Sequence, residues 1–136
     1  MPAHHTKEVP KLLAELPIHT ALPVTDMERA RRFYAEKLGL VPETELPDGT
    51  FYRCGAGTRF LLYPSQGASA GTHTQMTWNT ADIEAEVASL QARGVVFEEY
   101  NTPELKTVNG VATIAESKGA WFKDSEGNLL ALGQFD

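Results

Sequence analysis

Two polar residues at matching positions of a repeated sequence are the first candidates for chemistry. His19 and Gln75 stand 56 residues apart, and the same offset separates Asp26 from Asp82. Such a constant spacing indicates an internal repeat. An imidazole can bind a divalent metal or exchange a proton near neutral pH, whereas a carboxamide offers only neutral hydrogen bonds. The main functional question is therefore whether this pair holds a metal or contacts a bound small molecule.

The other reactive side chains indicate less chemistry. Cys54 is the single cysteine of the chain, so no internal disulfide is expected, and the residue suits a reducing cytoplasm. Its thiol would be a nucleophile only beside an activating base. Since no Cys–His arrangement is evident, we interpret it as a packed thiol. His4 and His5 are adjacent in the N-terminal segment and are interpreted as solvated.

Composition excludes several classes of partner. The 136 residues carry a formal net charge of −6, which disfavours nucleic acids and anionic membranes because both require a basic surface. The same acidity disfavours an anionic ligand, unless the local charge of the binding site differs from the net charge. No apolar run approaches the roughly 20 residues that span a bilayer, and the N-terminal segment lacks the apolar core of a secretory signal. We therefore expect a cytoplasmic globular protein without nucleic-acid or membrane partners.

The first repeat is predicted to contain a strand, a helix and three further strands. Residues 18–24 alternate as a half-buried strand does, and Thr25 with Glu28 has the form of a capping box at a helix start. Apolar residues then recur at helical spacing up to Leu38, and Gly39 is suited to end the helix. Three strands follow, separated by tight turns at 47–49 and 55–57, over residues 40–46, 51–54 and 58–63.

The second repeat follows a small, polar linker at 64–72, which we interpret as the crossover between the halves. A polar loop at 101–110 is a candidate rim or lid over a pocket. The other predicted elements are a strand at 75–80, a helix at 82–93 ended by Gly94, and strands at 95–100, 111–115, 120–123 and 129–135.

The N-terminal segment lies outside the repeats. Residues 9–16 are able to form a short helix with its leucines on one side, and a partner subunit is one candidate for the surface that they contact. The chain is thus predicted to have an extension at 1–16 and a single domain at 17–136, with repeats at 17–64 and 73–135.

Three segments carry a family resemblance: 19–26 (HTALPVTD), 32–40 (RFYAEKLGL) and 121–129 (WFKDSEGNL). The doubled unit with these segments resembles the vicinal oxygen chelate superfamily, the group of glyoxalase I, bleomycin-resistance proteins, fosfomycin-resistance proteins and extradiol dioxygenases. Ser125 stands where proline is usual in the closing hairpin of the family. The resemblance implies an α+β fold in which two tandem βαβββ repeats form curled mixed sheets. It also implies a site in the cup of those sheets and a homodimer.

The resemblance also assigns positions to the family metal, whose ligands come from the first and last strand of each repeat. In this chain they fall on His19, within 60–62, on Gln75 and on Ala131. Leucine and alanine cannot coordinate a metal, and a catalytic zinc site needs about three protein ligands. We therefore expect no metal and no other cofactor, and the base that the family reaction needs is missing as well.

The leading hypothesis is a metal-independent protein that binds a small apolar or aromatic ligand in the cup. The alternative is an enzyme of isomerase, lyase or dioxygenase type that uses His19 with an unplaced metal or acid–base partner. His19 is the best catalytic candidate, although its ring could instead be satisfied by neighbours such as Gln75. Which of Leu61 and Leu62 faces the cup stays open, as does the choice between Trp121 and Phe122. The predicted ligand-binding residues are His19, Tyr52, Cys54, Leu61, Leu62, Gln75, Thr77, Trp121, Leu129 and Ala131.

Overall fold

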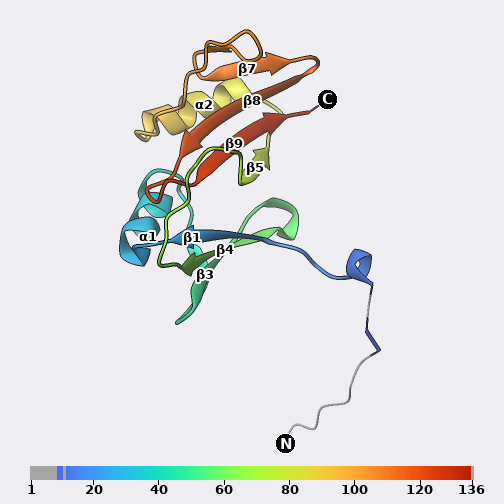
Figure 1. The fold of residues 1–136 in the computed structure, drawn as a ribbon, viewed down its shortest axis with the longest axis vertical. Helices are drawn as coiled ribbons and strands as arrows, with labels where there is room; N and C mark the ends of the chain where they lie inside the picture. Colours follow the sequence, from blue (N-terminus) through green and yellow to red (C-terminus); the bar gives the residue numbers. More distant parts are fainter. Residues whose placement is uncertain (1–8, 11, 136) are drawn as a thin grey trace, which may run out of the picture.

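The computed structural model describes residues 9–10 and 12–135 of the chain. The first half forms a four-stranded mixed sheet, in which the first strand pairs in parallel with the last and the other pairs are antiparallel (Figure 1). Its elements are β1 (Thr20–Val24), α1 (Met27–Glu36), β2 (Pro42–Leu46), β3 (Gly49–Arg53), the 3-10 turn η2 (Gly55–Gly57) and β4 (Arg59–Pro64), and the strand order is β1-β4-β3-β2.

The second half repeats this topology in a five-stranded sheet, where β5 pairs in parallel with β9. Two mixed sheets of βαβββ type confirm the predicted α+β fold. The sheets are not strongly curled, so each repeat offers an open sheet face in place of the curled cup that was predicted. The elements are β5 (Met76–Asn79), α2 (Ile83–Ala92), β6 (Thr107–Val108), β7 (Val111–Ile114), β8 (Ser117–Lys123) and β9 (Leu129–Gln134), in the order β5-β9-β8-β7-β6.

Both helices begin at an aspartate. The Asp26 carboxylate accepts a hydrogen bond from a backbone N–H of the first turn at 3.0 Å, and Asp82 caps α2 in the same way. The predicted N-cap, Thr25, is wrong, because its hydroxyl donates to the Glu126 carboxylate instead. Gly39, at a φ of +69°, follows α1 as predicted. No helix in the described part of the chain is long and apolar enough to cross a membrane.

The helix-facing sides of the two sheets share one core. Tyr52 stacks on Phe60 with ring centroids 5.0 Å apart, and Phe60 meets Trp78 edge-on at 6.0 Å. Trp78 in turn stacks on Phe122 at 6.4 Å. Because Phe60 belongs to β4 and Trp78 to β5, this row of aromatic rings crosses from one repeat to the other. Tyr34 of α1 packs on the row at Tyr52 and is fully buried.

The turn at 124–128 between β8 and β9, called the closing turn below, fastens the repeats together. The Asp124 carboxylate accepts the hydroxyl of Tyr34 at 2.7 Å and the backbone N–H of Asn128 at 2.9 Å. The side chain of Asn128 donates to the Pro23 carbonyl at 3.0 Å. These bonds tie the second sheet to both β1 and α1, so the DxExN spacing of the turn has a structural use.

Glu126 of the closing turn binds the start of α1. Its carboxylate accepts from the Arg29 side chain at 2.8 Å and from the backbone N–H of Thr25 and Asp26 at 3.1 Å each. Burial of Glu126 opposes its ionisation, but the hydrogen bonds from Arg29, Ser125 and the helix start outweigh that cost and lower its pKa to about 2. An anion at a helix N-terminus is also stabilised by the helix dipole.

The strand predicted at 95–100 is wrong. Val95 and Phe97 are buried as a strand pattern requires, but the segment makes only one isolated bridge, between Phe97 and Phe122. Beside that bridge, the Glu98 N–H donates to the Trp121 carbonyl at 2.8 Å, but the pairing cannot extend further along β8 because Ser117–Gly119 already pair with β7. Part of the polar loop predicted at 101–110 instead forms β6 and its turn into β7.

Residues 12–16, in the described part of the N-terminal segment, lie away from both sheets (Figure 1). Only the 3-10 turn η1 (Leu13–Glu15) forms, in place of the predicted short helix over 9–16. Leu13 is 84% and Ile18 94% exposed, so these apolar side chains are not packed on the described part of this chain. His4 and His5 lie outside the described residues.

Candidate functional site

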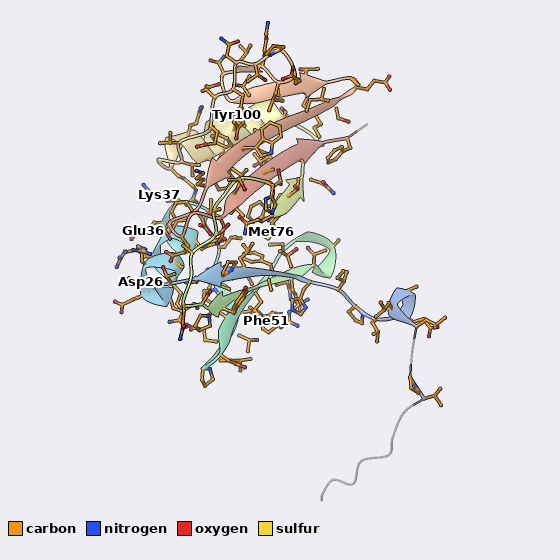
Figure 2. All side chains as sticks on the ribbon, viewed as in Figure 1. Asp26, Glu36, Lys37, Phe51, Met76 and Tyr100 are labelled. Atoms are coloured by element: carbon orange, nitrogen blue, oxygen red, sulfur yellow. The ribbon has the colours of Figure 1, made fainter. Side chains whose placement is uncertain are left out.

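The two sheets approach each other along their edge strands, β1 and β5 (Figure 1). Between them lies a groove of about 620 Å³, called the seam groove below and lined by residues 18–20, 54–56, 58–60 and 76–79. Figure 2 places Met76 between the two sheets, at this groove. Its apolar floor comes from Phe60, Met76 and Trp78, and its polar rim includes His19 and Arg59.

A second hollow of about 440 Å³, the sheet hollow, lies on the open face of the second sheet. Thr77 of β5 is in the lining of both hollows. The Trp121 indole stands in the sheet hollow, where its Nε1–H donates to Thr74 Oγ1 at 2.9 Å. Its ring also meets Tyr100 edge-on at 5.7 Å. A concave, largely apolar surface with a few oriented polar groups is typical of a small-molecule site. The sheet hollow is lined by residues 74, 77, 114, 117–119, 121, 131–133 and 135.

His19 lies at the rim of the seam groove, directly before β1, and is exposed. Its ring meets Phe51 edge-on, with ring centroids 5.2 Å apart. The guanidinium of Arg59 lies over the same phenyl ring, with Cζ 4.2 Å from the centroid. Among the described residues the His19 ring has no hydrogen-bond partner, which disfavours the alternative that neighbours such as Gln75 satisfy it.

Gln75 does not meet His19. Its Nε2 donates to Asn128 Oδ1 at 2.9 Å, and its Oε1 accepts from the backbone N–H of Leu129 at 2.9 Å and from Ser69 Oγ at 2.8 Å. The carboxamide therefore joins the linker, the closing turn and the start of β9. Both lone pairs of its oxygen and one of its two N–H groups are used by the fold, and it lines neither hollow.

The structure settles the two open choices of strand face. Leu61 lies opposite Ala21 and Phe51 on the open face of the first sheet, whereas Leu62 is fully buried. Trp121 is half-buried in the sheet hollow, whereas Phe122 is in the core.

Tyr52 lies on the helix-facing side and is fully buried, which corrects its predicted place in the cup. The alternation on β3 puts Phe51 on the open face, because side chains of successive strand residues point to opposite faces. Burial raises the pKa of the Tyr52 hydroxyl to about 12. That hydroxyl has no hydrogen-bond partner among the described residues.

Of the remaining predicted residues, three line the hollows. Cys54 lines the seam groove, where its Sγ accepts from the Trp78 indole N–H at 3.5 Å, and its thiol is free. Thr77 and Ala131 line the sheet hollow. Leu129 is buried and lines neither hollow.

The sequence analysis did not predict a cluster of charged side chains that lies near His19. Arg53 of β3 and Arg59 of β4 are directly opposite each other, and both bind Glu43 of β2, at 2.6 Å and 2.8 Å. The hydrogen bond from Arg53 is the main cause that lowers the pKa of Glu43. The signal was present in the sequence: a hairpin closed at 55–57 brings residues 53 and 59 into register.

Comparison with models of protein families identifies the family of this chain. The model of the Glyoxalase/Bleomycin resistance protein/Dioxygenase superfamily matches residues 17–132, which is nearly the whole described part of the chain. The chain belongs to this superfamily. The predicted resemblance is thereby confirmed.

Relatives in the superfamily extend over most of the chain. The uncharacterized protein YurT of Bacillus subtilis (strain 168) is 30% identical over 131 residues, covering 85% of this chain and 95% of YurT. TnmS3, an antibiotic binding protein from Streptomyces sp. CB03234, is 26% identical with a TM-score of 0.60, covering 93% of this chain and 100% of TnmS3. A glyoxalase/bleomycin resistance protein/dioxygenase from Alicyclobacillus acidocaldarius shares the fold with a TM-score of 0.68 at 17% identity, covering 89% and 92% of the two chains.

The metal of the superfamily does not fit this donor set. Within residues 9–10 and 12–135, no three His, Cys, Asp or Glu side chains gather where they could hold an ion. Of the positions that the resemblance assigned, His19 alone carries a good ligand, while Gln75 is engaged elsewhere and Ala131 has no donor atom. A neutral amide and one imidazole fall short of the three ligands that a catalytic zinc site needs.

Proposed function

We propose that this protein binds a small apolar or aromatic molecule in the two hollows that Thr77 lines. The observation that carries the proposal is the presence of two largely apolar hollows, the seam groove and the sheet hollow, of about 620 and 440 Å³, on either side of this residue. A surface of this size accommodates a drug-sized molecule. Trp78 and Trp121 stand in the two parts and offer flat, rigid contact areas.

The fixed orientation of the aromatic residues supports binding. The Trp121 indole is held by its hydrogen bond to Thr74 and by the ring of Tyr100, and the Trp78 indole by its contact with Cys54. Side chains already ordered in the free protein lose little conformational entropy when a ligand arrives. Membership in a superfamily that includes the antibiotic binding protein TnmS3 agrees with a binding role.

The protein is further proposed to form a homodimer in the cytoplasm. Phe135 and Ile114, at the sheet hollow, are 64% and 50% exposed, and the N-terminal segment adds further exposed apolar side chains. A second subunit would remove this apolar surface from water. Sedimentation of a monomer at micromolar concentration would contradict the proposed dimer.

The enzymatic alternative gains no specific support. A histidine that acts as a general base is usually oriented by a second polar group. In the described part of the chain, the His19 ring is contacted by the phenyl ring of Phe51 and by no carboxylate. Stoichiometric Ni²⁺, Zn²⁺ or Fe²⁺ in protein purified without chelator would reverse this preference.

The test of binding uses N-phenyl-1-naphthylamine, a neutral aromatic dye whose fluorescence rises in apolar surroundings. We expect saturable binding with a defined stoichiometry to the wild type. Thr77→Trp, which adds a large ring to both linings from an exposed strand position, should weaken it by about tenfold or more. Ser89→Trp on the exposed face of α2 is the matched control and should leave binding unchanged. Equal loss in both variants, or in neither, would contradict the proposed site.

A further inference from the structure

Two glycines lie directly opposite each other in the second sheet, Gly119 of β8 and Gly133 of β9. Neither has a positive φ, and the pairing of the two strands continues on both sides without a bulge. The backbone conformation therefore does not require glycine at either position. A glycine inside a regular strand costs stability, and it often marks a place where another group must approach the backbone closely. Both glycines line the sheet hollow.

An aromatic ring lies against each of the two glycines. A methyl group added at Gly119 would come within 2.9 Å of Trp121 Cη2, and one added at Gly133 within 2.5 Å of Phe135 Cε2. Both distances are shorter than a normal contact between carbon atoms, so each ring occupies space that a side chain on the glycine would need. The two glycines therefore form a flat surface on which rings can lie, called the glycine floor below.

The two rings on the glycine floor are held very differently. Trp121 is half-buried, with its indole N–H bonded to Thr74 and its ring against the ring of Tyr100. Phe135 directly follows β9 and is 64% exposed, and it packs on no other aromatic ring in the described part of the chain. The indole is therefore a fixed wall of the sheet hollow, whereas the phenyl ring can leave Gly133 by a change of side-chain rotamer.

We infer that the sheet hollow selects a flat aromatic molecule, which takes the place of the Phe135 ring on Gly133 and lies beside Trp121. This inference rests on the proposed binding function and adds the shape of the ligand to it. The phenyl ring of Phe135 demonstrates that a flat group fits on the floor, and it holds that place in the free protein. A molecule whose rings are twisted out of one plane makes less contact with the backbone, because dispersion attraction is lost when a gap of even half an ångström opens.

Thr77 borders the glycine floor on the side of β5. Its Cγ2 would lie 3.2 Å from a methyl group added at Gly133, so a ring on this glycine also contacts Thr77. The glycine floor thus lies beside the residue that lines both hollows. Gly133 and Phe135 are the residues that determine the shape of the ligand in this proposal.

The experiment compares carbazole with diphenylamine as competitors of N-phenyl-1-naphthylamine. The two competitors have the same carbon and nitrogen content, but one additional bond makes the rings of carbazole coplanar, whereas those of diphenylamine are twisted. Carbazole should displace the dye from the wild type at a concentration about tenfold lower than diphenylamine does. Gly133→Ala places a methyl group on the floor and should reduce this preference to about twofold or less. Gly67→Ala, in the exposed linker with open space at its Cβ position, is the matched control and should keep the preference of the wild type.

A second variant tests whether Phe135 occupies the place of the ligand. Phe135→Ala leaves the floor at Gly133 uncovered, so carbazole should bind more tightly than to the wild type. We expect a gain of about twofold to fivefold, because displacement of the phenyl ring exposes only the smaller, buried part of its surface to water. Val96→Ala, an exposed apolar residue outside both hollows, is the control and should leave the affinity for carbazole unchanged. Thermal unfolding and sedimentation of each variant check that the fold and the oligomeric state are those of the wild type.

The outcomes separate this inference from the proposed function. If N-phenyl-1-naphthylamine binds saturably but carbazole and diphenylamine displace it equally well, selection of a flat ligand is wrong and the binding function stands. An undiminished preference for carbazole in Gly133→Ala, or unchanged or weaker binding of carbazole in Phe135→Ala, likewise overturns the inference. If the dye does not bind the wild type saturably, the proposed function itself fails, and the inference fails with it.

Discussion

The closing turn and the seam groove both gather charged side chains from distant parts of the chain, but they use them in opposite ways. In the closing turn, the Glu126 carboxylate is 0% exposed and accepts six hydrogen bonds. In the seam groove, His19 and Arg59 are exposed and keep donors that no described residue uses. Polar groups that serve the fold are buried and saturated, whereas those suited to a ligand are open and only partly paired.

The largest expected effect is at Glu126, at the centre of the saturated cluster. Glu126→Gln removes the charge that binds Arg29 and the N-terminus of α1, so we expect a loss of about 3 kcal/mol in the free energy of unfolding. Urea unfolding measures this loss, and Glu28→Gln, an exposed carboxyl in the same helix turn, is the control. A change below about 0.5 kcal/mol would show that the cluster contributes little to stability.

Acid should weaken the same cluster. The pKa of Glu126 is lowered from 4.5 to about 2, so its contribution to stability is fully present above pH 4.5 and is lost as the pH falls towards 2. The difference in unfolding free energy between wild type and Glu126→Gln should therefore shrink progressively in urea titrations at pH 6, 4 and 3. A difference that stays constant over this range would contradict the assigned pKa.

A smaller loss of unfolding free energy is expected on substitution of Gln75. This variant tests whether Gln75 stabilises the fold or contacts the ligand. Gln75→Ala leaves the Leu129 N–H and the Asn128 carboxamide without their partner, at a cost of about 1–2 kcal/mol in unfolding free energy. Dye affinity should be unchanged because Gln75 lines neither hollow. Gln66→Ala in the exposed linker is the control. Unchanged stability combined with lost dye binding would instead show that Gln75 belongs to the binding site.

The smallest effect on stability is expected at His19. His19→Ala removes an exposed ring whose described contact is with the edge of Phe51, so unfolding free energy should change by less than about 0.5 kcal/mol. Binding of N-phenyl-1-naphthylamine should still weaken by about twofold, because His19 is part of the lining of the seam groove. His73→Ala, another exposed histidine, should leave both quantities as they are. A large loss of stability would show that His19 mainly stabilises the fold.

Local signals predicted most of the fold. The strand alternation, the helical periodicity and the glycine at 39 depend on neighbours in sequence, and all three correspond to observed elements. The N-cap was displaced by one residue because the partner of Thr25, Glu126, is 101 residues away. Such long-range competition leaves no mark in the local sequence.

Less of the candidate site could be predicted, because the register of each strand decides which of its residues face the site. A one-residue difference in phase moves every side chain of a strand to the other face, which is why Tyr52 was expected where Phe51 lies. Gln75 was misplaced for another reason: the groups that bind it come from the linker and from β9. The pairing of Arg53 with Arg59 required the register of the hairpin between them.

The most direct test of the binding site is a crystal structure of the protein with N-phenyl-1-naphthylamine bound. We predict density for the dye beside Thr77, in the seam groove or the sheet hollow, with a ring against Trp78 or Trp121. Density in the smaller pocket of about 260 Å³ that Leu38 and Leu90 line, with none at Thr77, would contradict it.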